Sequence, residues 1–460
     1  MNSKNTAKKK LKLKFCAGVG SVTGANFLLT NENKKILIDC GLTQGTKLAD
    51  DVNWQDFLYN PKEIDILFIT HAHIDHIGRI PKLYNDGFRG RIISTIPTMD
   101  ISRPMLLDTV GILGKDKENG LDEIYNDEII EKVLGLWEGV EYHQKIDLDT
   151  DYSVRFLDAG HILGSGMAEF TYNGTKILFT GDLGNSPSPI LPDTEAISGI
   201  TYMVMESVYG DRQHEDREER KKKLETVIED NYKQKGTLVI PTFSLERTQE
   251  LLYEINDLVE NKRIPPMPIY LDSPLGIRLT TIYKQCTKYF NEKARELISG
   301  GDDIFSFPGL RVTLETEDSK EILHIPDPKI IIAGSGMSNG GRILHHELNY
   351  LPGEKNTLLL TGYQAAGTMG RMIEDGAKTV TIMHEQVAVK AHVVKISGYS
   401  GHKDSDALVN FVEQISNEVK KVFPVMGETS SSLFLAQRLR DYLGVDAYVP
   451  SQGEEIELEF

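Results

Sequence analysis

Three histidines and an aspartate fall within six residues, directly after an apolar stretch. The block reads HAHIDH at residues 71–76 and follows the stretch 63–70, which is predicted to be a buried strand. Alternate side chains of an extended segment point to one side, and a turn at Asp75 can bring His76 back toward the same point. Imidazole and carboxylate groups together suit zinc, and less well manganese or iron. The chain is therefore expected to build a metal site at the end of a strand.

The hydrophobic pattern of the first half predicts strands joined by polar loops. With 460 residues, the chain exceeds what one hydrophobic core usually supports, so two domains are expected. Asn173-Gly174 lies between two apolar runs and predicts a tight hairpin turn. The stretch 101–150 has irregular apolar spacing and is expected to be helical cover. The predicted strands of this half lie at 35–39, 63–70, 153–158 and 167–180.

Beyond about residue 208, short apolar strands alternate with loops and helices. This alternation predicts a parallel α/β sheet whose ligands gather beyond the carboxyl ends of the strands. The charged run 211–223 is expected to be a solvated helix. The expected strands are 237–241, 268–271, 329–334 and 356–362.

The charge balance argues against broad, non-specific attraction to nucleic acid. The chain carries 51 basic and 68 acidic residues, for a net charge of -17. A local phosphate site built around metal ions stays compatible with this balance.

The sequence has no feature that directs a chain to the membrane or out of the cell. Three scattered cysteines give no disulfide framework, no apolar run is long enough to span a membrane, and the N-terminus lacks the apolar core of a secretory signal. A cytoplasmic protein is expected.

Two further candidate ligands follow predicted strands. His161 lies in the loop DAGHILGSG, and Asp182 lies in FTGDLGN directly after the predicted hairpin. A pair of metals bridged by a carboxylate can bind both oxygens of a phosphodiester. Together with the HAHIDH block, these residues form a constellation suited to phosphodiester chemistry.

The order of these motifs resembles a known fold. Asp39 in LIDCG, the HAHIDH block, His161 and Asp182 resemble the four sequential motifs of the metallo-β-lactamase fold. Segments farther along resemble the β-CASP nucleases, a family of RNA- and DNA-processing enzymes. They are Glu206 in MESVYGD, PTFSLERTQELLY (241–253), DSPLG (272–276), GSGMSNGGRILHH (334–346), GYQAAGTMGR (362–371) and ISGYSGHKD (396–404).

The resemblance implies an α/β protein in which a metallo-β-lactamase αββα sandwich carries an inserted parallel-sheet β-CASP domain. The first part of the sandwich would be residues 1–207, the inserted domain 208–390, and the completing part 391–460. It also implies a metal-dependent hydrolase, a ribonuclease acting in RNA processing or decay. Endonucleolytic cleavage is expected, with 5′–3′ exonuclease activity as an addition.

The resemblance further implies two Zn²⁺ sites and a catalytic group. One zinc would be held by His71, His73 and His161, the other by Asp75 and His76, with Asp182 bridging and Asp39 supporting the site. A metal-bound hydroxide would attack phosphorus. The catalytic residues would be Asp75, which positions the hydroxide, and His402, oriented by Glu206.

Met426 departs from the family pattern. RNA-cleaving relatives have a histidine ligand of the second metal in a VHGE-like segment, whereas this chain reads PVMGE at 424–428. A thioether suits zinc poorly beside carboxylates, so the second metal is expected to be held more weakly. His384 and His392 are the nearest residues that could replace the missing ligand.

Single-stranded RNA is the expected partner, bound mainly through its phosphates. A second copy of the chain, forming a homodimer, is a further candidate partner, and no membrane partner is expected. Two alternatives stay open: a DNA-end nuclease, because DNA-processing relatives also have an apolar residue at the position of Met426, and a catalytically weak RNA-binding scaffold subunit. The residues expected to contact phosphates are Ser244, Arg247, Ser335, Gly336, Arg342, Thr368, Gly370 and Arg371.

Overall fold

The described residues form two compact units. The first contains the described residues up to Ser188, the segment Asp193–Gln213 and the described residues from His402 onward. The second contains Pro189–Pro192 and the described residues between His214 and Gly401. Its long stretch begins and ends later in the chain than the expected 208 and 390, while Pro189–Pro192 precede the expected start. The computed structural model describes residues 11–44, 52–117, 119–214, 217–362, 364–365 and 367–459.

The first unit is built on two sheets. Its first sheet has the strand order β21-β1-β2-β3-β4-β5-β6. These strands are Glu455–Leu458 (β21), Leu11–Ala17 (β1), Asn26–Thr30 (β2), Lys35–Ile38 (β3), Ile66–Phe68 (β4), Arg91–Thr95 (β5) and Trp137–Val140 (β6). The second sheet has the order β20-β11-β10-β9-β8-β7. These strands are Lys421–Val425 (β20), Tyr202–Glu206 (β11), Thr175–Phe179 (β10), Gly166–Tyr172 (β9), Tyr152–Asp158 (β8) and Ile146–Asp149 (β7).

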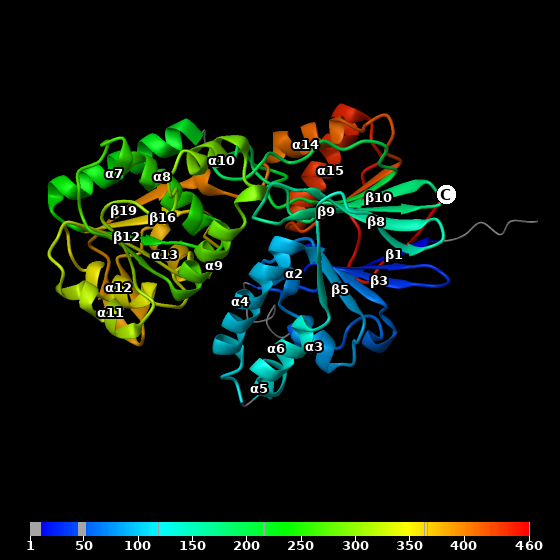
Figure 1. Cartoon of the computed structure of the whole chain (residues 1–460), viewed down its shortest axis with the longest axis horizontal. Helices are drawn as coiled ribbons and strands as arrows, with labels where there is room; N and C mark the ends of the chain where they lie inside the picture. The colour runs from blue at the N-terminus through cyan, green and yellow to red at the C-terminus, as the bar shows by residue number, and fades with distance from the viewer. Residues whose placement is uncertain are drawn as a thin grey trace, which may run out of the picture. The chain divides into compact units, whose positions relative to one another are not determined.

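The inner faces of the two sheets form one aromatic-rich core. Residues two apart on β1 and β4, such as Leu13 and Phe15, point inward because side chains alternate along a strand. Phe68 of the first sheet meets Phe170 of the second edge to face, with ring centroids 5.3 Å apart. The core therefore sits between the sheets, as Figure 1 shows.

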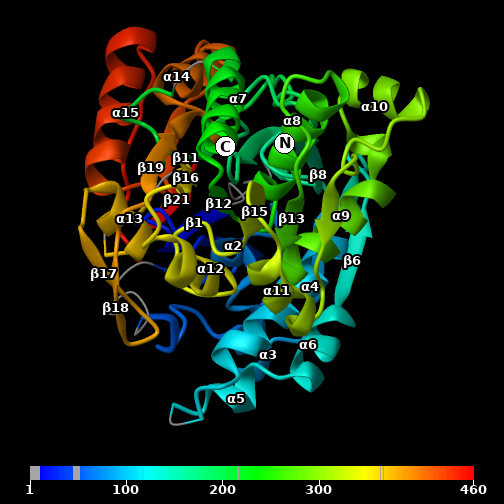
Figure 2. The same cartoon turned by 90° about the vertical axis from the view of Figure 1, so that its left-hand side faces the viewer.

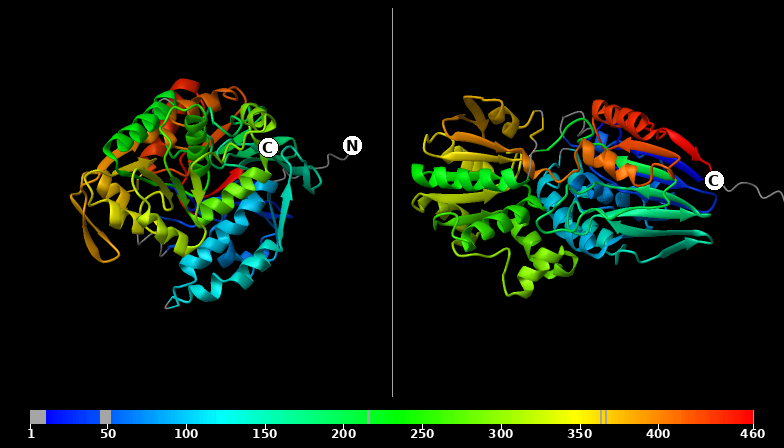
Figure 3. Two further views of the ribbon diagram at one scale, coloured as in Figure 1. Left: turned by 60° about the vertical axis from the view of Figure 1, so that its left-hand side comes forward. Right: turned by 90° about the horizontal axis from the view of Figure 1, so that it is seen from above.

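Helices cover the outer faces of both sheets. The helices α14 (Ser405–Glu413) and α15 (Thr429–Leu443) lie on the second sheet (Figures 1 and 3), where Phe411 and Leu435 join an outer apolar cluster. The predicted αββα sandwich is confirmed. The helices associated with the first sheet are α2 (Ile74–Ile77), α3 (Ile80–Asn85), α4 (Ile96–Leu113), α5 (Leu121–Ile124) and α6 (Asp127–Leu134).

The predicted hairpin is confirmed, whereas the helical cover is confirmed only in part. Asn173 and Gly174 both have positive φ, 49° and 82°, as a two-residue hairpin turn with right-handed strand twist requires. The stretch 101–150 contains α4 to α6, but its last part forms β6 and β7 at the edges of the two sheets. Short edge strands bury few side chains, so their apolar pattern is too sparse to predict.

The second unit contains a parallel sheet with the strand order β14-β13-β15-β12-β16-β19. The four strands predicted for this region are confirmed as β12, β13, β15 and β16, while the edge strands β14 and β19 were not predicted. The strand bounds are Leu310–Val312 (β14), Ile269–Asp272 (β13), Lys329–Ala333 (β15), Thr237–Pro241 (β12), Thr357–Thr361 (β16) and His392–Ile396 (β19).

Helices lie on both faces of this sheet, and its central strands are accordingly buried at every residue and apolar in their middle. Figures 1 and 2 show α7 (Arg217–Gln234) and α8 (Arg247–Glu260) on one face and α12 (Ile343–Tyr350) on the other. A hairpin of β17 (Thr379–Ile382) and β18 (Glu385–Ala388) extends beside the sheet (Figure 3). The remaining helices are α9 (Pro274–Gln285), α10 (Glu292–Ser299), α11 (Thr316–Glu321) and α13 (Met369–Glu374).

The charged run at the start of α7 is only partly solvated. Arg220 is 2% exposed and lies among buried carboxylates, so the expectation of a wholly solvated helix was wrong at this residue. None of the helices in the described part of the chain is long and apolar enough to cross a membrane.

Candidate metal centre

The HAHIDH block leaves the end of β4 and turns into the short helix α2. His71 is fully buried, His73 lies at the N-terminus of α2, and Asp75 and His76 lie within it. Nε2 of His71 is 3.1 Å from Nδ1 of His73, and Nε2 of His161 is 3.3 Å from the same nitrogen. Three imidazoles from two loops therefore converge, His71 and His73 from the β4–α2 loop and His161 from the loop between β8 and β9.

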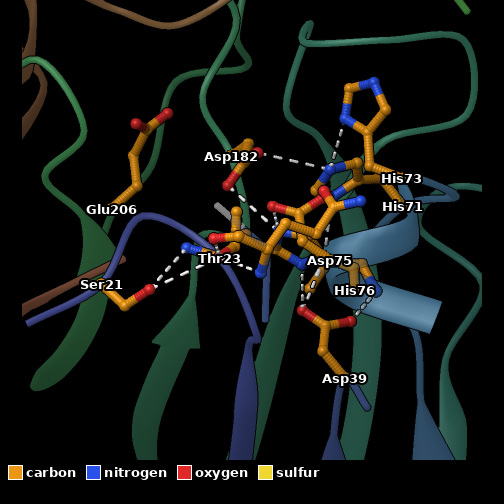
Figure 4. Close-up of polar contacts among 12 residues, drawn as sticks. Ser21, Thr23, Asp39, His71, His73, Asp75, His76, Asp182 and Glu206 are labelled. Carbon is orange, nitrogen blue, oxygen red and sulfur yellow. Dashed lines mark hydrogen bonds and ion pairs between the residues drawn. The ribbon is translucent and has the colours of Figure 1, made fainter. Parts of the chain in front are cut away.

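Asp182 lies beside imidazoles of both predicted ligand sets. Its Oδ2 is 3.4 Å from Nε2 of His71 and 3.5 Å from Nε2 of His161. Its Oδ1 is 3.4 Å from Nε2 of His76. Figure 4 shows the carboxylate of Asp182 directed toward His71 and His76. A carboxylate in this position can serve two cations at once.

Asp39 sets the orientation of His76. Its Oδ2 is 2.8 Å from Nδ1 of His76, and it also accepts hydrogen bonds from the backbone N–H and the hydroxyl of Thr70. Holding Nδ1 in this way turns Nε2 of His76 toward Asp182, with Oδ2 of Asp75 3.9 Å away. Thr70 was not singled out from the sequence, because a threonine at a strand end is common.

The donor set fits a cation. Nε2 of His76 and Oδ1 of Asp182 are buried and make no hydrogen bond to any residue that the structure describes. Buried polar atoms rarely lack partners, and in a metal site the partner is the ion. Ligand atoms of His71, His73, His161 and Asp182 all lie within 4.8 Å of one another. Donors about 2.1 Å from a tetrahedral zinc would be roughly 3.4 Å apart, close to the separations seen here.

The protonation states also suit metal ligands. Burial and the neighbouring imidazole of His71 hold the pKa of His73 well below its usual range, and burial with His402 does the same for His161. Burial opposes ionisation of Asp182, but His76 and His71 outweigh it and hold the pKa of that carboxyl well below its usual range. Neutral imidazoles at His73 and His161 beside an ionised Asp182 are the forms that bind a cation. Burial opposes the charge on His76, but the carboxylates of Asp182 and Asp39 outweigh it and hold the pKa of His76 well above its usual range, so this imidazole must release a proton when it binds a metal.

His402 lies against the same cluster from another direction. Its Nδ1 is 3.1 Å from Oε2 of Glu206 and 3.9 Å from Oδ2 of Asp182. Burial alone would lower the pKa of His402, but the charges of Glu206 and Asp182 outweigh it and raise this pKa to about 9. Glu206 is 1% exposed, and its Oε1 also accepts the N–H of Leu183. The pair can hold a proton next to the metal ligands.

The backbone around Gly184 brings together the Asp182 loop, the His161 loop and His402. Gly184 forms an isolated bridge with His402, and the N–H and Nζ of Lys403 donate to the carbonyls of Leu183 and Gly184. A Cβ on Gly184 would lie 1.8 Å from the carbonyl oxygen of Gly160, so only glycine fits. Gly184 thus lets the Asp182 loop pass between the loop of His161 and His402. This role of Gly184 was not predicted from the sequence, although a glycine two residues after the candidate ligand Asp182 could have indicated a close approach of the backbone.

The glycine-rich loop between β1 and β2 was also missed. Gly18, Gly20 and Gly24 all have positive φ, and the N–H of Ala25 donates to the carbonyl of Asp75 at 2.9 Å. Figure 4 shows the side chains that this loop presents beside the metal ligands. They are Ser21 and Thr23.

Met426 borders the predicted second metal position. It is 2% exposed, has a φ of 47°, and its N–H donates to the carbonyl of Gly18 at 2.7 Å. The residue lines one cavity together with Asp39, His76 and Glu206. Met426 and His76 therefore border the same cavity, and the sulfur of Met426 lies beside Gly18. The two candidate replacements lie in the second unit, in the turn of the β17–β18 hairpin and at the first residue of β19; they are His384 and His392.

The residues expected to contact RNA follow the carboxyl ends of strands β12, β15 and β16 in the second unit. Ser244 and Ser273 approach to 3.1 Å, and the side-chain amide of Gln364 donates to the carbonyl of Gly336. The loops therefore share one edge of the sheet. Ser335 and Ser244 are half-buried, and the side chain of Arg371 is 42% exposed beside Asp375.

Other members of this set are occupied inside the unit. The Arg342 guanidinium donates to Asp272 and to the carbonyls of Thr313 and Leu314, and that of Arg247 is paired with Glu250. The hydroxyl of Thr368 caps α13 and donates to the carbonyl of Ala365, and the N–H of Gly370 donates to the carbonyl of Met337. These four residues therefore use polar groups inside the unit, and their role as phosphate contacts stays a prediction.

Sequence comparison divides the chain in the same way as the fold. Residues 28–208 match the metallo-beta-lactamase superfamily domain, and residues 248–373 match the Beta-Casp domain. Residues 386–450 match a domain described as the Zn-dependent metallo-hydrolase RNA specificity domain.

Several curated proteins are similar over nearly the whole chain. Ribonuclease TTHA0252 of Thermus thermophilus is 34% identical over 91% of this chain and 93% of its own length. An RNase J-like protein of Methanocaldococcus jannaschii is 30% identical over 96% and 98%, and transcription termination factor FttA of Methanosarcina mazei is 28% identical over 96% and 70%. A crystal structure of a protein of unknown function from Enterococcus faecalis V583 shares the fold, with a TM-score of 0.59 at 13% identity, covering 98% of this chain and 100% of that one.

Proposed function

Because the chain belongs to the β-CASP family of metallo-β-lactamase-fold hydrolases, we propose that it is a zinc-dependent ribonuclease that cleaves single-stranded RNA. The observation that carries the proposal is the convergence of three imidazoles and one carboxylate beside the His402–Glu206 pair. The similarity to proteins named as ribonucleases supports RNA as the substrate. The match to an RNA specificity domain supports it independently.

The donor set would hold two zinc ions. His71, His73 and His161 would hold one and Asp75 and His76 the other, and the separate contacts of the two Asp182 oxygens support a bridging role. Bound zinc would supply Lewis-acid stabilisation of the phosphate oxygens and lower the pKa of a coordinated water.

The protein side chains would orient the reactants and move the protons. Asp75 would accept the proton of the attacking water at a carboxylate oxygen. His402, charged by virtue of Glu206, would face the phosphate and stabilise the developing charge on its oxygens. Attack with departure of the 3′ oxygen leaves a 5′-phosphate on the downstream product.

The two metals would be held unequally. A cation held by His76, Asp75 and one oxygen of Asp182 has no further protein donor at residue 426, where the thioether of Met426 lines the neighbouring cavity. We expect this cation to exchange first, because the other has three histidines from two separate loops.

RNA would be bound mostly through its backbone. We retain four candidates for phosphate contact in the second unit, which are Ser244, Ser335, Gly336 and Arg371. Such contacts carry no sequence information, so weak base preference is expected.

The test is hydrolysis of matched single-stranded RNA and DNA oligonucleotides by the purified protein, before and after chelation and zinc repletion. We expect RNA cleavage with 5′-phosphate ends, lost on chelation and restored by zinc. Preferential DNA cleavage would support the DNA-end alternative, and RNA binding without any cleavage at full zinc occupancy would identify a scaffold. The Asp182→Asn variant, which removes a carboxylate charge from the centre, should lose both zinc and activity.

A further inference from the structure

We propose that Tyr399, Glu254 and Arg220 of the second unit are positioning residues for His402. The inference rests on the proposed function, because it assigns these residues a role in the reaction that His402 serves. They form a buried network on the short segment that immediately precedes His402 in the chain.

The segment 397–401 reads SGYSG and connects β19 to His402. Two glycines and two serines give such a segment little conformational preference of its own. Its one large side chain is Tyr399, which is 1% exposed. The course of the chain just before His402 is therefore set by what holds Tyr399 and its neighbours.

Tyr399 is held by a charge network between α7 and α8. Its hydroxyl donates to Oε2 of Glu254, and the other oxygen of Glu254 accepts from Arg220. The Arg220 guanidinium lies over the Tyr399 ring, 4.2 Å from the centroid, and donates to the carbonyl of Gly398 at 2.9 Å. Arg220 thus contacts the carboxylate of Glu254 as well as the Tyr399 ring and the Gly398 carbonyl of the segment 397–401.

The burial of this network indicates a positional role. Arg220 is 2% exposed and Glu254 is 5% exposed, so both charged groups are shielded from solvent. A buried ion pair with directional hydrogen bonds favours one arrangement, whereas a hydrophobic contact permits sliding. The network therefore fixes the position of Tyr399, three residues before His402.

The network continues to the loop at the start of α8. Glu250, one helical turn before Glu254, lies 4.0 Å from Arg220 and is paired with Arg247. Arg247 opens α8 directly after the loop that carries Ser244, a candidate phosphate contact. The same carboxylates therefore connect the chain before His402 with a loop proposed to meet RNA.

On the other side, His402 is held within the first unit by Gly184 and Glu206. The residue follows the unit border at 401/402 directly, so its backbone is held on both sides. Loss of the Tyr399 hydroxyl should loosen only the segment 397–401 that precedes His402. The imidazole would then keep its chemistry but lose part of its alignment with the reacting phosphate.

The experiment compares Tyr399→Phe with Tyr283→Phe. Tyr283 is a fully buried tyrosine of the same unit whose hydroxyl donates to a different buried carboxylate, Glu246. Both changes remove one hydroxyl and keep the ring. We expect Tyr399→Phe to lower kcat about 10-fold, with KM within about 2-fold and zinc content unchanged, since small misalignments cost rate rather than binding. Tyr283→Phe should leave kcat within about 2-fold.

A double-mutant cycle with His402→Ala separates positioning from a general structural effect. If Tyr399 acts through His402, Tyr399→Phe should lower kcat no further in the His402→Ala background. An equal loss in both backgrounds, or an equal loss in Tyr283→Phe, would overturn the inference. Full activity of Tyr399→Phe would also overturn it. Absence of RNA cleavage by the unmodified, zinc-loaded protein would instead overturn the proposed function itself.

Discussion

His402 and Glu206 lie 196 positions apart in the chain, yet Nδ1 of His402 is 3.1 Å from Oε2 of Glu206. Glu206 ends β11, a strand inside the second sheet, and is held there by the N–H of Leu183. His402 is the first residue of the first unit after the inserted segment. The contact therefore joins the two parts of the metal-bearing unit that the insertion separates in sequence.

His402→Ala should lower kcat by about 10²–10⁴ while leaving the zinc content near normal. The imidazole lies beside the metal ligands, but neither ligand set needs it. Single-turnover RNA cleavage and metal analysis of the purified variant check this. Zinc loss in the variant would show that His402 is itself a ligand.

Met426→His should tighten the more weakly held zinc and raise activity at limiting zinc. The backbone at this position is left-handed, with φ 47°, a conformation that histidine adopts more readily than most residues. An imidazole there would enter the cavity that also borders His76. The measurement is a zinc titration in a metal buffer. Met426→Leu is the control, because it keeps an apolar side chain and should leave both affinities unchanged; equal affinity of both sites in the unmodified protein would refute the asymmetry.

Arg371→Ala should change RNA binding, whereas Arg342→Ala should change stability. Arg371 is exposed and its pair with Asp375 contributes little, so its removal should weaken RNA binding and lower the salt slope by about 0.7. Arg342 donates to Asp272 and to two carbonyls, so its removal should reduce the free energy of unfolding by about 1–3 kcal/mol. Binding isotherms at several salt concentrations and urea unfolding test both. An unchanged salt slope in Arg371→Ala would remove this residue from the RNA site.

Glu347→Gln should make stability less dependent on pH. Burial raises the pKa of Glu347 from its ordinary 4.5 to about 8, so between these values the folded protein holds a proton that the unfolded chain has released. Stability then falls as pH rises through this window, by up to about 1.4 kcal/mol per pH unit. The variant should lose this contribution, measured by urea unfolding from pH 5 to 8. Glu317→Gln, at an exposed residue, is the control and should keep the original slope.

Gly184→Ala should destabilise the protein by about 1–3 kcal/mol and weaken zinc binding. The added methyl would lie 1.8 Å from the carbonyl oxygen of Gly160, which forces the loops of Asp182 and His161 apart. Gly111→Ala is the matched control: a Cβ there meets nothing within 4 Å on the exposed side of α4, so stability should rise by about 0.5–1 kcal/mol. Normal zinc affinity in Gly184→Ala would show that the loops can move independently.

The metal ligands of the HAHIDH block were predictable because their information is local. Six consecutive residues after a buried strand already confine His71, His73 and His76 to one small volume, whatever the rest of the chain does. The inner strands β15 and β16 were predictable for the same reason, since a strand buried on both faces is largely apolar. The inner strands β1, β2, β5 and β11 of the first unit were not predicted. The edge strands β6, β7, β14 and β19 bury less and lack that pattern.

The residues proposed to contact RNA were less predictable from local sequence, as Arg342 and Arg371 illustrate. Both arginines follow glycine-rich loops at strand ends, and their local sequences favour phosphate binding equally. Only the folded chain reveals that Asp272, 70 residues away, already binds Arg342, while Arg371 stays exposed. Whether a charge is available depends on distant partners.

The sequence by itself determined the candidate metal ligands and the parallel α/β pattern of the second half, because these follow from residue types at short spacing and from hydrophobic periodicity. The αββα sandwich and the insertion of the second sheet were implied by the resemblance of the motifs to the metallo-β-lactamase fold and the β-CASP nucleases. The tertiary structure decided which groups meet: Asp182 among imidazoles from separate loops, His402 against Glu206, and Tyr399 within the Arg220–Glu254 network. These contacts join residues tens to hundreds of positions apart. They form only when the whole chain buries its apolar surface, and that collapse, rather than any local preference, brings their polar atoms together.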